Sequence, residues 1–262
     1  MGETVVGHEV SPFLWEVQAA RFDRNCGQMA ASVGTLGSLN RMPARLLFAD
    51  AHAAQDALTF ASRAARLTED AVRLQASGGT LAMTAAPLAP RGLMDATPTV
   101  LGMRALRVDP ELVCDLVVPA TSLVSDAERP DALVLPDAAV SAAWAGVAPP
   151  RAGWSEGGQI DAATLASRAQ WGIQAVAEQL PTDPGEDIVR TIRFGVWAAA
   201  DDSLEGLPLG TAFAAFALGF IAGEESARVF HSGSWTRVSL SRGHVLVRRP
   251  VRMGMTAVRT TG

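Results

Sequence analysis

Apolar residues recur at helical spacing through the first 77 residues of the chain. They first advance by alternating steps of four and three, which places them on one face of a helix: Trp15, Ala19, Phe22, Cys26, Met29, Val33 and Leu36. After the polar stretch 38–43 the same spacing returns: Leu47, Ala51, Ala54, Leu58, Ala61, Ala65, Thr68 and Val72. The second run stops before Gly78 and Gly79, as is typical of a helix end. The pattern predicts an antiparallel helical hairpin over residues 1–80.

The pattern becomes strand-like after Thr97, where β-branched residues and leucines gather in short runs. Three such runs, bounded by breaks that contain proline, lie at 97–108, 111–124 and 131–136. They predict two or three strands, and hence a small central β-sheet within residues 81–150. A stretch rich in proline and glycine, 148–159, then indicates a linker to a third region, residues 151–262.

Residues 151–262 combine helical patterns with a hairpin at their end. Asp161 can cap a helix over 162–180, and an uncharged run, 207–223, has the character of a buried core helix. In 235–249 apolar and polar residues alternate around an Arg-Gly pair, which predicts a β-hairpin whose apolar face packs on that core helix. We therefore expect an α+β fold: a long N-terminal antiparallel helical hairpin, a small central β-sheet, and a helical C-terminal part ending in a basic β-hairpin.

Charge is distributed unevenly along the chain, whose net charge is −5. Residues 226–262 hold seven arginines and no acidic residue, whereas 1–225 hold 15 arginines against 27 acidic residues. Seven uncompensated arginines repel one another unless an anionic surface faces them. The sequence therefore predicts an anionic-partner contact formed by Arg237, Arg242, Arg248, Arg249 and Arg252. Two alternatives stay open at this point: the acidic body of the same chain, or an external partner such as nucleic acid or an acidic protein.

Several chemistries are excluded by composition. All 22 basic residues are arginine, so that Schiff-base lysines, phosphate-loop lysines and the kinase-type strand lysine are absent. Cys26 and Cys114 stand far apart, which allows neither a CxxC redox pair nor a zinc knuckle. His52 and Asp56 have helical spacing but no visible third ligand, so no metal site is predicted. Since no nucleophile motif is present either, we assign no catalytic residue and expect no cofactor.

These observations favour a non-enzymatic interaction or assembly protein that contacts partners through the helical hairpin and the basic C-terminal hairpin. A homo-oligomer or a protein partner is expected, because alanine-rich helices pack closely against copies of themselves. The first 18 residues lack the segments of a secretory signal, so cytoplasmic residence without membrane contact is expected. The alternatives are a nucleic-acid-binding protein that uses the arginine-rich C-terminal hairpin, and an enzyme whose site has no recognisable sequence pattern.

Overall fold

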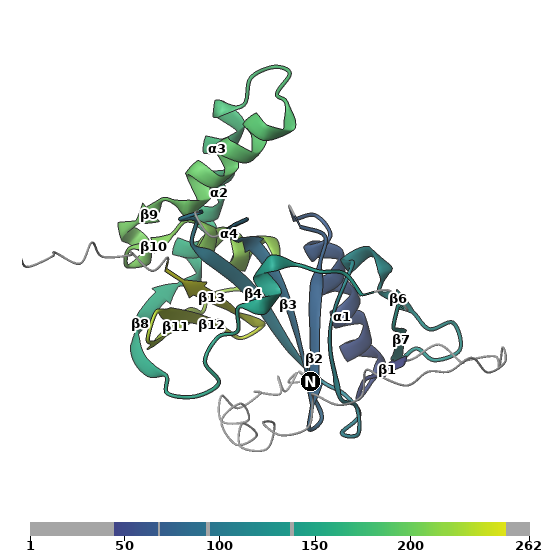
Figure 1. Cartoon of the computed structure of the whole chain (residues 1–262). Helices are drawn as coiled ribbons and strands as arrows, with labels where there is room; N and C mark the ends of the chain where they lie inside the picture. Colours follow the sequence, from purple (N-terminus) through teal and green to yellow (C-terminus); the bar gives the residue numbers. More distant parts are fainter. Residues whose placement is uncertain (1–44, 68, 93–94, 137–138, 250–262) are drawn as a thin grey trace, which may run out of the picture.

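An antiparallel sheet of eight strands forms the centre of the molecule (Figure 1). A computed structural model describes residues 45–67, 69–92, 95–136 and 139–249 of the chain. The strands of the sheet are, in spatial order, β5 (Cys114–Val118), β2 (Val72–Ser77), β3 (Thr80–Leu88), β4 (Thr99–Arg107), β13 (Gly243–Arg248), β12 (Trp235–Leu240), β11 (Ser226–Ser232) and β8 (Ser155–Asp161). Two smaller sheets join β1 (Arg45–Leu47), β7 (Ala132–Val134) and β6 (Val124–Ser125), and β9 (Ala200–Asp201) and β10 (Leu207–Pro208).

Each half of the chain contributes one three-stranded meander to this sheet. β2, β3 and β4 follow one another in the first half, and β11, β12 and β13 follow one another in the second. The last strands of the two meanders, β4 and β13, pair antiparallel at the centre, with Leu101 opposite Leu246. The two halves are therefore related by an approximate twofold arrangement, and one continuous sheet joins them.

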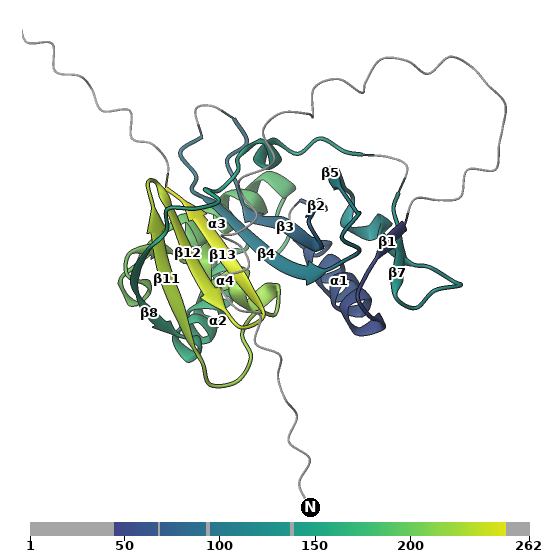
Figure 2. The ribbon, with the colours of Figure 1, turned by 90° about the horizontal axis from the view of Figure 1, so that it is seen from below.

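Four helices in the described residues lie on one face of the sheet: α1 (Ala51–Ala64), α2 (Ala162–Gln179), α3 (Glu186–Ala198) and α4 (Gly210–Ala217). Only the base of α2 and α3 packs there, and the rest of these two helices projects from the body. Short 3-10 helices lie at η3 (Ala120–Ser122), η4 (Ala143–Gly146) and η5 (Asp202–Leu204). Alternate strand residues such as Leu74, Val238 and Val245 point to the helices and are fully buried in the main core. Figure 2 shows α2 and α4 behind strands β11 to β13. A second, smaller apolar cluster contains Trp144, Leu101 and Leu246.

The predicted N-terminal helical hairpin is wrong. Its first helix lies outside the described residues, and its second is divided among β1, α1 and β2, because α1 ends at Ala64 and Val72 begins a strand. Gly78 and Gly79 have φ values of 56° and 81°, so they form the two-residue turn between β2 and β3 instead of ending a helix. The predicted small central β-sheet is wrong as well, because strands from all three predicted regions join one eight-stranded sheet. The described residues are thus rich in sheet and contain four α-helices.

The C-terminal hairpin is present as β12 and β13, with Val238 opposite Val245. Its apolar face packs on α4, as the alternation of residues predicts. The uncharged run 207–223, predicted to be the core helix, forms a shorter helix than expected. Pro208 lies in β10, and Gly219 follows the last turn of α4. Among the described residues, no helix has the length and apolar character needed to cross a bilayer.

Candidate functional site: an arginine-lined groove along helix α1

Helix α1 turns an alanine-rich face to the core and a polar face outward. The helix begins after Asp50, whose carboxylate accepts a hydrogen bond of 2.8 Å from the Ala53 N–H. Ala54, Ala57, Ala61 and Ala64 are buried, and these small side chains bring the helix close to the sheet. The residues between them line two pockets, one on each side of α1.

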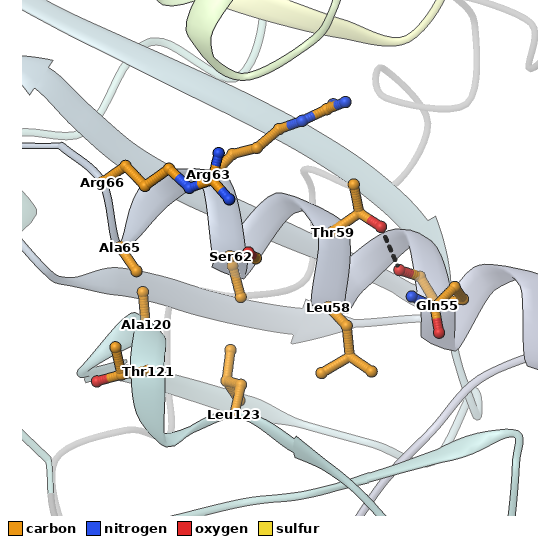
Figure 3. A pocket seen from close by; sticks show the side chains of 11 residues that line it. Gln55, Leu58, Thr59, Ser62, Arg63, Ala65, Arg66, Ala120, Thr121 and Leu123 are labelled. Atoms are coloured by element: carbon orange, nitrogen blue, oxygen red, sulfur yellow. Dashed lines mark hydrogen bonds between the residues drawn. The ribbon is translucent and has the colours of Figure 1, made fainter.

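The first pocket, of about 560 Å³, lies between α1 and the segment that contains η3 (Figure 3). Leu58, Ser62 and Ala65 point from the helix toward Ala120 and Leu123, which form the opposite wall. Thr59 donates a hydrogen bond of 2.9 Å to the carbonyl oxygen of Gln55. The wall of this pocket is thus mixed: leucine and alanine side chains form one part of it, and polar residues, among them Arg63 and Arg66, form the rest.

The second pocket, of about 390 Å³, lies between elements from both halves of the chain. It is lined from α1, β4, the end of α4 and the β12–β13 turn by Asp56, Thr59, Phe60, Arg63, Arg104, Leu218, Gly219, Phe220 and Arg242. Thr59 and Arg63 line both pockets. We call the two pockets together the α1 groove.

Two of the arginines are held by the fold. Arg63 Nη1 donates a hydrogen bond of 2.9 Å to the carbonyl oxygen of Leu218, at the C-terminus of α4, where the helix dipole favours a cation. Arg104 forms an ion pair with Asp56 and donates to the backbone carbonyl of Arg242. These contacts fix the Arg63 and Arg104 side chains at the wall of the second pocket.

The other two arginines are exposed. Arg66 lies just beyond the end of α1, and Arg242 lies in the β12–β13 turn. Neither forms an ion pair with any described residue. Four guanidinium groups therefore line the α1 groove against the single carboxylate of Asp56, in a protein whose net charge is −5. Guanidinium groups stay charged at all physiological pH values, so the α1 groove attracts anions.

The five arginines predicted from the sequence do not converge. Arg242 lines the α1 groove, whereas Arg237 lies on the sheet face away from the helices, with its guanidinium 4.7 Å from the Trp154 ring and 4.6 Å from the Phe230 ring. Arg248 ends β13, and Arg249 follows it and donates a backbone hydrogen bond to Ser234. The extended strand between Arg242 and Arg248 separates them by about 20 Å. Arg252 lies outside the described residues.

Sequence reasoning missed three of the four arginines that line the α1 groove. Arg63 and Arg66 stand three positions apart in the predicted second helix, so this spacing was a usable signal. No pattern in the sequence marked Arg104, because its approach to the β12–β13 turn depends on the pairing of β4 with β13. Within the described ranges, no cluster of three or more histidine, cysteine or acidic residues could hold a metal. Asp56, weighed with His52 as a metal ligand, is the ion-pair partner of Arg104.

Solved structures with a similar arrangement include bacterial DNA polymerase sliding clamps. The Caulobacter crescentus clamp has a TM-score of 0.40 and 15% identity, covering 81% of this chain and 67% of the clamp. A putative DNA polymerase III beta subunit from Eubacterium rectale has a TM-score of 0.41 and 8% identity, covering 78% and 64%. This chain therefore spans about two thirds of the length of these proteins. Similarity at this level carries no functional argument.

Family models cover most of the sequence in two parts. No curated protein matches the chain. The division of the chain into the three regions 1–80, 81–150 and 151–262, made from the sequence, stays a prediction. Residues 42–146 match a model described as "Domain of unknown function (DUF8010)", and residues 149–252 match one described as "Domain of unknown function (DUF8185)".

Proposed function

We propose that this chain is a non-enzymatic interaction protein that binds an acidic, partly apolar segment of a partner protein in the α1 groove. One observation supports the proposal: Arg63, Arg66, Arg104 and Arg242, from three separate segments, line adjoining pockets that contain a single carboxylate. Arginine forms paired hydrogen bonds with carboxylates, so such a lining favours an acidic ligand.

The shape of the α1 groove favours a protein segment over a small ion. In the first pocket Leu58 and Leu123 form an aliphatic part of the wall, which fits an apolar side chain, beside polar residues such as Ser62. Its volume of about 560 Å³ exceeds what a single carboxylate or phosphate fills. A segment that carries acidic residues beside an aliphatic one matches both the walls and the arginines of the α1 groove.

Nucleic acid is the second candidate, because phosphates also bind arginine. Nucleic acid would contact the arginines of the α1 groove but not the aliphatic side chains of its first pocket. The basic C-terminal arginines remain a separate proposal for such a contact, and Arg248 and Arg249 lie away from the α1 groove. The experiment below therefore includes both kinds of ligand and both sets of arginines.

The binding test compares a charge-reversed α1 groove with a matched control. Arg66→Glu with Arg242→Glu removes the two exposed arginines of the α1 groove, and Arg107→Glu with Arg249→Glu makes the same charge change at exposed positions elsewhere. The probes are a fluorescein-labelled Glu-rich peptide with two leucines and a labelled single-stranded oligonucleotide, measured by fluorescence anisotropy.

We expect the peptide to bind the parent and the control equally, and to bind the groove variant at least about tenfold more weakly. Binding should weaken as salt rises, because exposed charges are screened. Equal peptide affinity of all three proteins would contradict the proposal. Tight binding of the oligonucleotide but not of the peptide would favour nucleic acid. A loss of affinity confined to the control, Arg107→Glu with Arg249→Glu, would favour the basic tail.

A further inference from the structure

Helices α2 and α3 form a hairpin that projects from the body of the molecule (Figure 1). The first part of α2 packs on α4 and buries Ala162, Leu165, Ala169 and Gly172. Beyond it, no residue from Ile173 to Gly195 is buried, and all of these residues are described. Ala175, Val176 and Phe194 touch the edge of the core, but none of these 23 consecutive residues is buried in it.

This hairpin exposes large apolar side chains. Trp171 is 49% exposed, Ile173 42% and Ile188 49%, although isolated surface helices usually turn such residues inward. Arg168 stacks on the Trp171 ring at 4.5 Å, but Ile173 and Ile188 are not among the residues packed against the core. Apolar side chains on a projecting element are typical of a surface that a partner covers.

The end of the hairpin is also acidic. Residues 173–189, which we call the acidic tip, contain four carboxylates and no arginine: Glu178, Asp183, Glu186 and Asp187. Ile188 directly follows two of these residues. The acidic tip therefore carries carboxylates beside an exposed aliphatic side chain, which is the combination that the arginines of the α1 groove and the leucines of its first pocket fit.

We propose that the segment bound in the α1 groove is the acidic tip of a second copy of this chain. This inference rests on the proposed function and names its partner. In Figures 1 and 2 the hairpin and α1 lie at separate places on the molecule, so the contact forms between copies and not within one. The acidic tip carries four carboxylates, of which Asp187 is paired with Arg190, and the α1 groove carries four guanidinium groups, of which Arg104 is paired with Asp56. The remaining charges on these two surfaces are opposite and therefore complementary.

A charge-swap experiment tests this contact by sedimentation velocity. The tip variant is Glu178→Arg with Asp183→Arg, and neither residue forms an ion pair with a described residue. The groove variant is Arg66→Glu with Arg242→Glu. Each variant places like charges in the contact, whereas an equimolar mixture restores opposite charges between the reversed tip of one and the reversed groove of the other.

The parent is expected to self-associate at tens of micromolar, and less so at high salt. Each variant alone should associate at least about tenfold more weakly, and the mixture should recover to within about threefold of the parent. Circular dichroism and thermal unfolding show whether each variant is folded. A monomeric parent, or folded variants that associate as the parent does, would overturn the inference, as would a mixture without recovery.

The two proposals fail in different ways. If the Glu-rich peptide binds the parent and loses affinity only in the groove variant while the parent stays monomeric, the α1 groove binds acidic segments but the second copy is not the partner. If neither the peptide nor a second copy binds, both proposals are wrong. The tip variant separates them further, because its intact α1 groove should bind the peptide as the parent does.

Discussion

Gly219 allows Arg63 to reach the end of α4. The residue has a left-handed φ of 71°, and its N–H donates to the carbonyl oxygen of Phe216 at 3.0 Å. A methyl group on its Cα would overlap the guanidinium group of Arg63. The flexible arginine would move away, which breaks its hydrogen bond to Leu218. This glycine thus sets the position of an arginine that lines both pockets of the α1 groove.

Replacement of Gly219 by alanine should therefore lower the unfolding free energy by more than backbone strain alone would. The matched control is Gly223→Ala, because Gly223 has a φ of 68° and nothing within 4 Å of the added methyl group. We expect both variants to lose about 1 kcal/mol or more of unfolding free energy, and Gly219→Ala to lose about 1 kcal/mol beyond the control. Urea denaturation measures both values. Equal losses would show that the Arg63 contact does not contribute.

His244 makes stability depend on pH. Burial lowers the pKa of its imidazole to about 4, and the charges of Arg237 and Arg104 act in the same direction. Its Nδ1 shares a hydrogen bond of 3.0 Å with Ser239 Oγ. Unfolded histidine has a pKa of 6.5, so between these values the unfolded chain binds a proton that the folded chain does not. The contribution of His244 to stability is therefore lost as pH falls from about 6.5 toward 4.

His244→Gln removes this titration. Between pH 7.5 and pH 5 we expect the parent to lose about 1–2 kcal/mol more unfolding free energy than the variant. Urea denaturation at the two pH values measures the difference. Parallel losses in the two proteins would mean that His244 titrates normally in the folded state.

At the scale of elements, local patterns predicted those parts of the fold that depend on local sequence. The alternation around Arg242 predicted β12 and β13, and the alanine pattern from Ala51 predicted a helix there. The prediction failed from Val72 to Ser77, because alternate residues of a strand and a helix stripe share several positions in an alanine-rich sequence. What decides between them is pairing with β3 and β5, which no local pattern contains.

At the scale of the whole molecule, the α1 groove exists because the two halves of the chain share one sheet. The pairing of β4 with β13 brings Arg104 within hydrogen-bonding distance of the Arg242 carbonyl, 138 positions away in the sequence. The charge count predicted one contact that contains Arg242 together with Arg248 and Arg249, which lie at the other end of the β-hairpin. Composition shows how much charge a region carries, whereas the tertiary fold determines which charges meet.

Hydrogen–deuterium exchange of the parent protein, with and without the Glu-rich peptide, tests the central claim most directly. The account predicts slower exchange in α1, in residues 218–220 and in the β12–β13 turn, because these segments line the α1 groove. Exchange in β8, on the far edge of the sheet, should stay unchanged. Protection confined to residues 248–249, or unchanged exchange throughout α1 at a saturating peptide concentration, would contradict the account.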